Sequence, residues 1–457
     1  MTTILVTLQV LMVSPKHLFV GSATKFFGKP YRLSRHEKTC NSNVKHKFPG
    51  FLYKIKKTIF EKLQYMGFVL EDNDNFFPYF TTWDLESFQT AVTNDSELAR
   101  LQWLAEHVPA SISVASKVPG YENAHCFVTT CDSKQLVSEF VRYIFEISDT
   151  SYPLLKEKFE NVFSELDVML NNLPDEDEEG KAQLFKLKKK FDLFLKEMPV
   201  LGFNSSRYDI NVIKQFLFKE VDTIELEEDE GNGFGFVVKR NNAYMCLKTD
   251  RLKFLDICNY LAPGYSYDQF LKAYECTAQK GFFPYEWCDS IDKLEFGQLP
   301  HHEAFFSALR NTNITLEEYE YCCSIWRDCG MESFRDYLIW YNNLDVEPFV
   351  EAVGKMFQFY QRKNLDLFKD GISVPGLVMK YMFSGLDANT YFSLFQERDK
   401  DLYYELKKTL LGDRLLFSIA ITRETKHLFR TLKIQTLERL FRFRMYFPWS
   451  KMTKRSA

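Results

Sequence analysis

The chain has 457 residues, 46% of them hydrophobic and 16% aromatic, and it carries a formal net charge of −4 at pH 7. This length and composition predict a globular protein of two or three domains with a large buried core. No run of 18 apolar residues occurs, so we expect no membrane-spanning helix, and the charge shows no basic excess of the kind found in dedicated phosphate-binding domains. The ten cysteines lack paired spacing, which is typical of reduced, intracellular proteins.

The first part of the chain leads from an irregular segment into strands. Residues 1–47 are basic and irregular, and the spacing of apolar residues over residues 53–66 predicts a helix. Residues 76–86, 110–118 and 125–130 are rich in β-forming residues and predict three short strands. Because these strands follow one another along the chain, we expect them to begin one sheet.

The middle of the chain has helical periodicity. Apolar residues recur at three- and four-residue steps over residues 133–171 and 183–198, on either side of an acidic loop at residues 174–180. Residues 199–204 then predict a buried strand that stops at a polar turn. We therefore predict that residues 133–198 form a helical insertion next to the sheet.

Further strands and helices complete the pattern. Residues 234–238 and 244–249 flank a polar turn and predict a hairpin, and residues 253–257 predict one more strand. Residues 316–357 are mainly helical in pattern. Strands that alternate with helices predict an α/β (α+β) fold, in which helices flank a mixed central sheet.

Three short acidic motifs supply the candidate functional residues. Asp84 and Glu86 lie two residues apart at the predicted end of a strand, where alternation places both side chains on one face. Asp209 follows a strand and a polar turn and begins a helix-like stretch. Tyr341 and Asp345 are four residues apart in a predicted helix, so that the phenol and the carboxylate share one face.

A common site for these carboxylates requires a cation. Four carboxylates at one point repel one another unless a divalent ion supplies the compensating charge. Carboxylate oxygens favour Mg²⁺ or Mn²⁺, and two such ions about 3.5–4 Å apart activate a water and stabilise the leaving oxygen of a phosphodiester. The motifs therefore predict two bound ions and phosphodiester hydrolysis. Tyr341 would orient the attacking water, since a phenol with a pKa near ~10 is a poor base at neutral pH.

Each motif alone also has a simpler interpretation. In a chain with 62 acidic residues, pairs such as Asp-x-Glu and Tyr-x-x-x-Asp arise by chance and are usually solvated surface groups. Their order, and their placement on a strand end, a strand-turn and a helix, favour a functional site. Asp256, on a predicted strand, is a rival ligand, although a single aspartate on a strand is more often a structural hydrogen-bonding residue.

At these residues the chain resembles the exonuclease domain of family B DNA polymerases, whose motifs run Asp-x-Glu, Asn-x(2 or 3)-aromatic-Asp and Tyr-x-x-x-Asp in that order. The resemblance to the protein-primed branch, found in viruses, linear plasmids and Maverick/Polinton-like transposons, covers residues 48–412. It rests on the stretches GFNSSRYDINVIKQ, FLDICNYLAPGYSYDQFLKAY, GFFPYEW and DYLIWYNNLDVEPFV. It implies a ribonuclease H-like 3′-5′ exonuclease fold, single-stranded DNA 3′ ends as substrate, a terminal protein as primer and no membrane partner.

The resemblance also implies roles for individual residues. The implied metal ligands are Asp84, Glu86, Asp209 and Asp345. Asn204 and Tyr208 would hold the frayed 3′ end by hydrogen bonding and stacking. Ser266 occupies the place of a DNA-contacting Ser/Thr-Leu motif, with Tyr267 instead of the leucine. Lys293 begins a Lys-x-x-hydrophobic motif that resembles a catalysis-supporting lysine, and the alternative is an exposed lysine beside a helix.

Other segments depart from the family. Residues 28–40 resemble half of a C2H2-like zinc finger with His36 and Cys40, but no upstream cysteine completes it, so we predict no zinc site. The motifs Asp-x-x-Ser-Leu-Tyr, Lys-x-x-x-Asn-Ser-x-Tyr-Gly and Asp-Thr-Asp of the polymerase palm do not occur, so we expect no polymerase activity from this chain. The predicted parts are residues 1–47, an exonuclease domain at 48–365, the start of a polymerase region at 366–412 and a basic tail at 413–457.

Two other interpretations stay open. One is a catalytically silent, transposon-derived remnant that binds DNA or protein, and the other is a polymerase that works with a palm on a separate chain. DNA as the substrate favours the nucleus as the location. Mitochondria are the alternative, because the protein-primed branch includes enzymes of mitochondrial plasmids.

Overall fold

The computed structural model describes residues 48–55, 57–91, 105–130, 132–227, 233–276, 281–308, 310–387 and 390–404. The zinc-finger-like segment with His36 and Cys40 and the basic tail at 413–457 lie outside these residues. The chain divides into two compact units, one formed by residues 57–385 and the other by the segments before and after it. The division between the two units falls near residues 56 and 385.

The smaller unit contains a two-stranded sheet. Strand β1 (Leu52–Lys54) pairs antiparallel with β9 (Tyr391–Ser393), and the centres of the Tyr53 and Phe392 rings lie 6.2 Å apart.

The helix expected over residues 53–66 is shorter than predicted, because β1 takes up residues 52–54, and it belongs to the larger unit. It is α3 (Ile59–Tyr65), because the Thr58 side chain accepts a hydrogen bond from the backbone N–H of Glu61 and marks the start of the helix.

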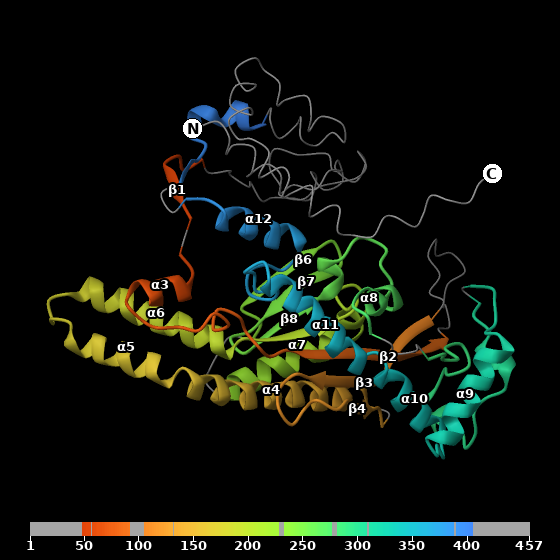
Figure 1. The fold of residues 1–457 in the computed structure, drawn as a ribbon. Coiled ribbons are helices and arrows are strands. Elements are labelled where there is room, and N and C mark those ends of the chain that lie inside the picture. Colours follow the sequence, from red (N-terminus) through yellow and green to blue (C-terminus); the bar gives the residue numbers. More distant parts are fainter. Residues whose placement is uncertain are drawn as a thin grey trace. The chain divides into compact units, whose positions relative to one another are not determined.

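The larger unit is built on a seven-stranded mixed sheet with the strand order β4-β3-β2-β5-β8-β7-β6 (Figure 1). The strands are β2 (Thr81–Ala91), β3 (Ala105–Ser116), β4 (His125–Val128), β5 (Met198–Gly202), β6 (Phe236–Arg240), β7 (Ala243–Lys248) and β8 (Leu252–Asp256). The central strands β2, β5 and β8 are parallel, and the neighbours on both sides are antiparallel. The predicted mixed sheet is therefore confirmed.

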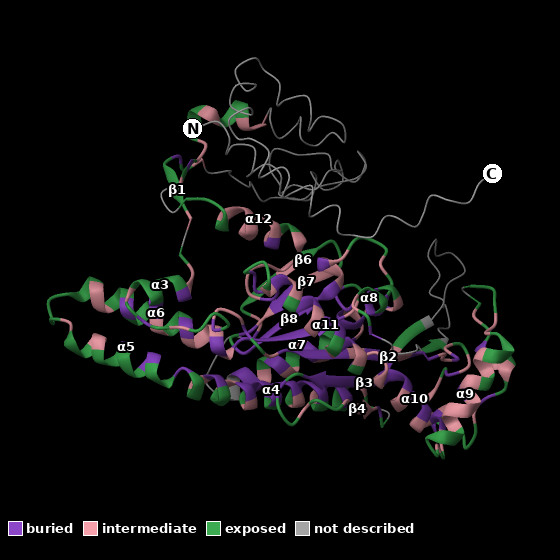
Figure 2. Ribbon diagram, viewed as in Figure 1, coloured by how far each residue is buried: buried purple, intermediate pink, exposed green. Residues whose placement is uncertain are grey.

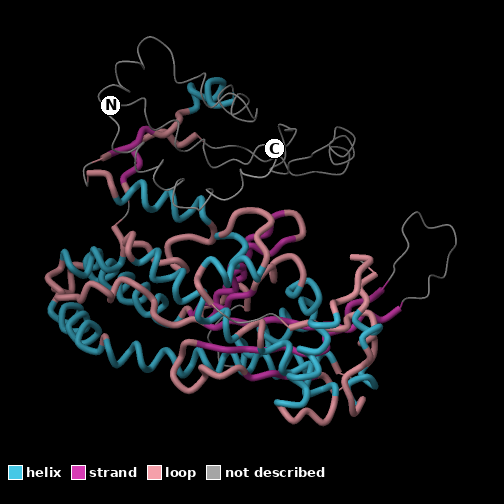
Figure 3. The backbone as a smooth tube through the Cα atoms, turned by 45° about the vertical axis from the view of Figure 1, so that its right-hand side comes forward, coloured by secondary structure: helices cyan, strands magenta, loops and turns pink. Residues whose placement is uncertain are grey.

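Helices flank this sheet, as the sequence predicts for an α/β protein (Figures 1 and 3). Besides α3, the helices of the larger unit are α4 (Ser133–Lys158), α5 (Glu160–Asn172), α6 (Glu178–Lys196), α7 (Asp209–Glu227), α8 (Tyr267–Ala273), α9 (Leu316–Asp328), α10 (Phe334–Asn343), α11 (Glu347–Gln361) and α12 (Val374–Ser384). In the part of the chain that the structure describes, no helix combines the length and the apolar character needed to cross a bilayer.

The central strands are buried on both faces. Val200 and Phe254, on β5 and β8, belong to the apolar core that contains residues of α4 and α7. The next residues along these strands, Leu201 and Leu255, belong to a second core with residues of α8 and α11. Because neighbouring residues of a strand point to opposite faces, helices must cover both sides of the sheet. Figure 2 shows these strands as the most buried part of the larger unit.

Strand β2 differs in extent from its prediction. The sequence places it at residues 76–86, with the two carboxylates at its end, whereas β2 spans Thr81–Ala91 and both carboxylates lie within it. The segment before β2 is not part of the strand. There the backbone N–H of Phe77 donates a hydrogen bond to the side chain of Asp366, at 2.7 Å from Oδ2, and not to a neighbouring strand. The strand continues past the carboxylates because it pairs with β3 along its full length, with a register shift between Glu86 and Ser87.

Candidate metal centre

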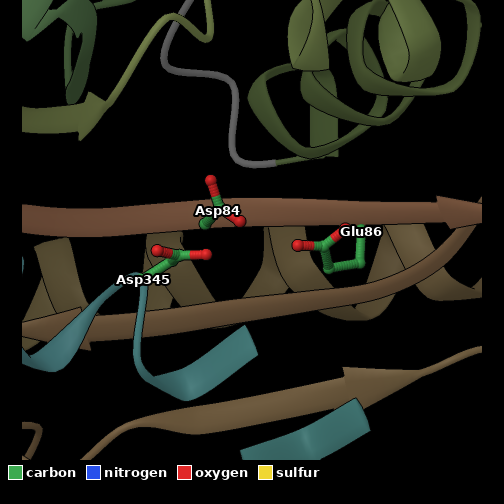
Figure 4. Close-up of side chains that lie close together, drawn as sticks. All are labelled: Asp84, Glu86 and Asp345. Carbon is green, nitrogen blue, oxygen red and sulfur yellow. The ribbon is translucent and has the colours of Figure 1, made fainter. Parts of the chain in front are cut away.

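Three carboxylates from two distant parts of the chain meet beside β2. Asp84 and Glu86 project from the same strand, and Asp345 reaches them from the turn between α10 and α11 (Figure 4). One oxygen of each lies within 4.8 Å of one oxygen of each of the others. The expected helix through Tyr341 and Asp345 is corrected in one respect, since α10 ends at Asn343 and places Asp345 in the following turn.

Hydrogen bonds from α10 hold this cluster in place. Asn342 Nδ2 donates to Asp84 Oδ2 at 3.1 Å, and Asn342 Oδ1 accepts a hydrogen bond from Ser111 Oγ on β3 at 2.9 Å. Its neighbour Asn343 accepts from Ser113 Oγ at 2.8 Å. The sequence interpretation missed these residues. The sequence feature that could have indicated them is the pair Ser111 and Ser113, two residues apart on a strand. Their small polar side chains leave space for the end of a helix to pack against that face and to form hydrogen bonds with it.

Asp209 lies in the same pocket but outside the three-carboxylate cluster. It is the first residue of α7, as the strand-turn-helix pattern predicts, and it is buried. Burial raises the pKa of the Asp209 carboxyl to about 8, and the nearby Asp256 carboxylate contributes to the increase. The raised pKa means that ionisation of this carboxyl is unfavourable in the pocket. A bound cation would lower the free energy of the ionised form, because its positive charge attracts the carboxylate.

Asp256, the rival ligand, uses its carboxylate in hydrogen bonds to backbone N–H groups, two of which belong to the turn that follows β5. Its carboxylate accepts hydrogen bonds from the backbone N–H groups of Asn204, Ser206 and Cys258, at 3.0, 3.1 and 2.8 Å. Asn204 has a positive φ of 61°, a conformation in which asparagine is more common than most residues. Asp256 thus organises the turn that delivers Asn204 to the pocket.

Two tyrosine hydroxyls form a chain of hydrogen bonds that ends at Glu86 of the cluster. The Tyr341 hydroxyl is buried and pairs with the Tyr285 hydroxyl at 2.9 Å, and Tyr285 in turn donates to Glu86 Oε1 at 3.3 Å. Burial raises the pKa of both phenols well above the ordinary range, so both keep their protons. Tyr285 lines the pocket and was missed as a site residue, although it belongs to the GFFPYEW stretch noted in the sequence.

The pocket that contains these groups has a volume of about 800 Å³. It exists because β5 pairs with β2 only at Thr81 and Thr82 among the described residues, so β2 runs on where β5 ends. Clefts outside the carboxyl ends of parallel strands are common binding sites in α/β proteins. The residues that line this pocket include Asp84, Glu86, Ser87, His107, Asn204, Arg207, Tyr208, Asp209, Asp256, Tyr285 and Asp345.

The remaining two predicted residues have other contacts. Ser266 is the N-cap of α8, where its hydroxyl accepts from the Gln269 N–H at 3.2 Å, and it does not occur among the described residues that line the pocket. Lys293 Nζ lies 4.5 Å from the centre of the Trp287 ring, and it is likewise outside the pocket lining. The structure therefore brings seven of the nine predicted residues to the pocket or directly behind it, and leaves these two elsewhere.

The donor set fits a hard divalent cation. Oxygen ligands at about 2.0–2.6 Å from Mg²⁺ or Ca²⁺ lie at most about 5 Å from one another, and the three carboxylate oxygens satisfy this condition. All the donors are carboxylates, which suit Mg²⁺ and Mn²⁺ better than zinc or copper. No protein-family model matches the chain, and neither the curated proteins nor the solved structures gave a match.

Proposed function

We propose that the chain is a metal-dependent 3′-5′ exonuclease that shortens DNA from its 3′ ends, of the proofreading type found in protein-primed family B DNA polymerases. The convergence of Asp84, Glu86 and Asp345 carries this proposal, since Asp345 lies about 260 positions after the other two in the chain and still shares one pocket with them. The buried Asp209 adds a fourth carboxylate to the pocket lining, as the three ordered motifs require.

The architecture supports the same proposal. A mixed central sheet flanked by helices is what a ribonuclease H-like exonuclease fold requires. The predicted helical insertion corresponds to α4, α5 and α6, which precede β5 in the chain. The Asp-x-Glu pair lies on a central strand and the second motif on the turn after its parallel neighbour, so both motifs reach the pocket from rigid elements.

The chain's own residues would bind, orient and hold the reacting groups. Asp84, Glu86 and Asp345 would hold the ions, which when bound supply an activated water and stabilise the leaving oxygen. Asn342 fixes the orientation of Asp84 through its hydrogen bond to that carboxylate. In the same way, Tyr285 fixes the orientation of Glu86. Because the Tyr285 phenol keeps its proton, it acts as a hydrogen-bond donor in the site and not as a base.

The other wall of the pocket suits the end of a DNA strand. Asn204 and Arg207 are exposed on the turn before α7, and an amide and a guanidinium can contact sugar and phosphate oxygens. Tyr208 offers an aromatic face beside them, on which an unpaired base can stack. This combination favours a frayed single strand over an intact duplex, because a base must leave its stack to use the ring.

The test is a cleavage assay with purified protein, Mg²⁺ and a single-stranded oligonucleotide labelled at its 3′ end. We expect release of labelled mononucleotides, and a fall of at least about 100-fold in the variant Asp84→Ala/Glu86→Ala, as for other groups that stabilise transition-state charge. The matched control Glu176→Ala/Glu178→Ala removes two exposed carboxylates at the same spacing and should cleave normally.

A second readout separates the nuclease from a silent remnant. Calorimetric titration with Mn²⁺ should show binding to the wild type and none to the Asp84→Ala/Glu86→Ala variant. A protein that binds the oligonucleotide but neither binds Mn²⁺ nor cleaves would be the catalytically silent, transposon-derived remnant. Equal cleavage by the double variant and the wild type would refute the nuclease proposal.

A further inference from the structure

Three polar side chains from three segments meet on the wall of the pocket next to the carboxylates. The Tyr208 hydroxyl lies 2.6 Å from His107 Nδ1 and 2.7 Å from Ser87 Oγ, and Ser87 Oγ lies 3.2 Å from the same ring nitrogen. All three residues line the pocket. Ser87 is on β2, His107 on β3 and Tyr208 in the turn before α7, so the contact exists only in the folded chain.

The triangle fixes the phenol ring. Each hydroxyl proton is used once if Tyr208 donates to His107 Nδ1 and Ser87 donates to the phenol oxygen. The His107 ring also meets the Tyr208 ring edge to face, with ring centres 5.3 Å apart and an angle of 87°. With one polar and one aromatic contact from the same histidine, the ring has little freedom to turn.

Neighbouring residues of β2 make these two sets of contacts. Glu86 Oε1 accepts a hydrogen bond from Tyr285, and Ser87 Oγ contacts the Tyr208 hydroxyl. The register of β2 against β3 shifts between these two residues. The same strand thus supplies a carboxylate to the ion cluster and, at the next residue, a hydroxyl to Tyr208.

We propose that His107, with Ser87, is a positioning residue for Tyr208, and that the fixed phenol ring is the platform for the terminal base of a single-stranded 3′ end. This inference rests on the proposed nuclease function. His107 is exposed and would not touch the cleaved bond. Its effect is on the orientation of the ring that holds the DNA end, so it acts on binding and not on the chemical step.

The test measures DNA binding and cleavage separately. A single-stranded oligonucleotide with fluorescein at its 5′ end and a free 3′ hydroxyl is titrated with protein in EDTA, and KM and kcat are then measured in Mg²⁺. Loss of one hydrogen bond predicts that His107→Ala raises the dissociation constant and KM about 5-fold and changes kcat less than about 2-fold. The His107→Asn variant places an acceptor near the position of Nδ1 and should restore binding to within about 2-fold of the wild type.

Coupling between the two residues is the decisive observation. In a Tyr208→Phe background the phenol hydroxyl is gone and only the edge-to-face ring contact with His107 remains, so His107→Ala should cause a much smaller loss of binding than it does in the wild type. The matched control is His125→Ala, since His125 is another exposed histidine of the sheet, lies beside the Tyr143 ring at 4.9 Å and does not line the pocket. It should bind and cleave as the wild type does.

Two results would overturn the inference. One is wild-type binding by His107→Ala, and the other is a His107→Ala effect that is undiminished in the Tyr208→Phe background. Failure of the nuclease proposal is a different result, since it is seen as cleavage that does not depend on Asp84 and Glu86. The binding titration in EDTA does not depend on cleavage. It therefore tests the role of His107 whether or not the protein is a nuclease.

Discussion

Replacement of Asp209 by asparagine should change how the stability of the fold depends on pH. Asp209 is buried at the first residue of α7, and burial together with the nearby Asp256 carboxylate raises its pKa from the ordinary value of 3.8 to about 8. Between these two values the folded protein binds one proton more than the unfolded chain does. The stability contributed by this proton is present below the unfolded pKa and is lost as the pH rises through about 8.

The size of the effect follows from linkage. One proton bound only in the folded state changes the free energy of unfolding by up to about 1.4 kcal/mol per pH unit. With a folded-state pKa of about 8, the wild type should lose about 2 kcal/mol between about pH 6.5 and pH 8.5. Asp209→Asn has no such proton, so the variant should lack this slope.

The assay is urea unfolding at several pH values in the absence of divalent ions. The quantity of interest is the difference between wild type and variant, because it cancels other titrations such as that of Lys369, whose pKa burial lowers to about 8. Asp222→Asn, on an exposed position of the same helix, is the matched control and should keep the wild-type slope. Parallel pH profiles for wild type and Asp209→Asn would refute the reasoning. Added Mg²⁺ should reduce the wild-type slope, since it favours the ionised carboxylates of the folded state.

Three further substitutions separate the roles of other residues. Tyr285→Phe removes a donor to Glu86 and should weaken Mn²⁺ binding about 10-fold in calorimetry, as for other groups that orient metal ligands; an unchanged affinity would contradict this role. Asp256→Ala leaves three backbone N–H groups without their acceptor and should lower the free energy of unfolding by about 2–4 kcal/mol in urea titrations, and a loss below about 0.5 kcal/mol would show that the turn does not depend on it. Lys293→Ala loses only its contact with the Trp287 ring and should keep cleavage within about 2-fold, whereas a loss above about 10-fold would place this lysine at the DNA.

Local patterns predicted most elements because each depends on its own residues. The run that forms β5 is apolar and ends at Gly202, where a side chain would meet Ser205 Oγ at 2.4 Å, so the strand-turn-helix unit could be anticipated from sequence. The limits of β2 could not be anticipated. They depend on pairing with β3 and on the bond from Phe77 to Asp366, which is 289 residues away.

The candidate site was predictable in part for the same reason. The alternation of Asp84 and Glu86 on a strand is a local property, and the structure places both side chains in the three-carboxylate cluster. The partners of these carboxylates were not identified, because Asn342 and Tyr285 carry no local mark of their role. A tyrosine in an aromatic stretch usually belongs to a core, and only its neighbours in the fold show otherwise.

The amino-acid sequence alone determined the α/β class, the positions of most helices and strands and the carboxylates worth following, since hydrophobic periodicity and turn residues act over a few neighbouring positions. The tertiary structure decided which of these residues meet. It brought Asp345 to β2 and His107 to Tyr208, and it left Ser266 and Lys293 away from the pocket. Such meetings depend on how helices pack on the sheet and where strands diverge, and no short stretch of sequence contains that information.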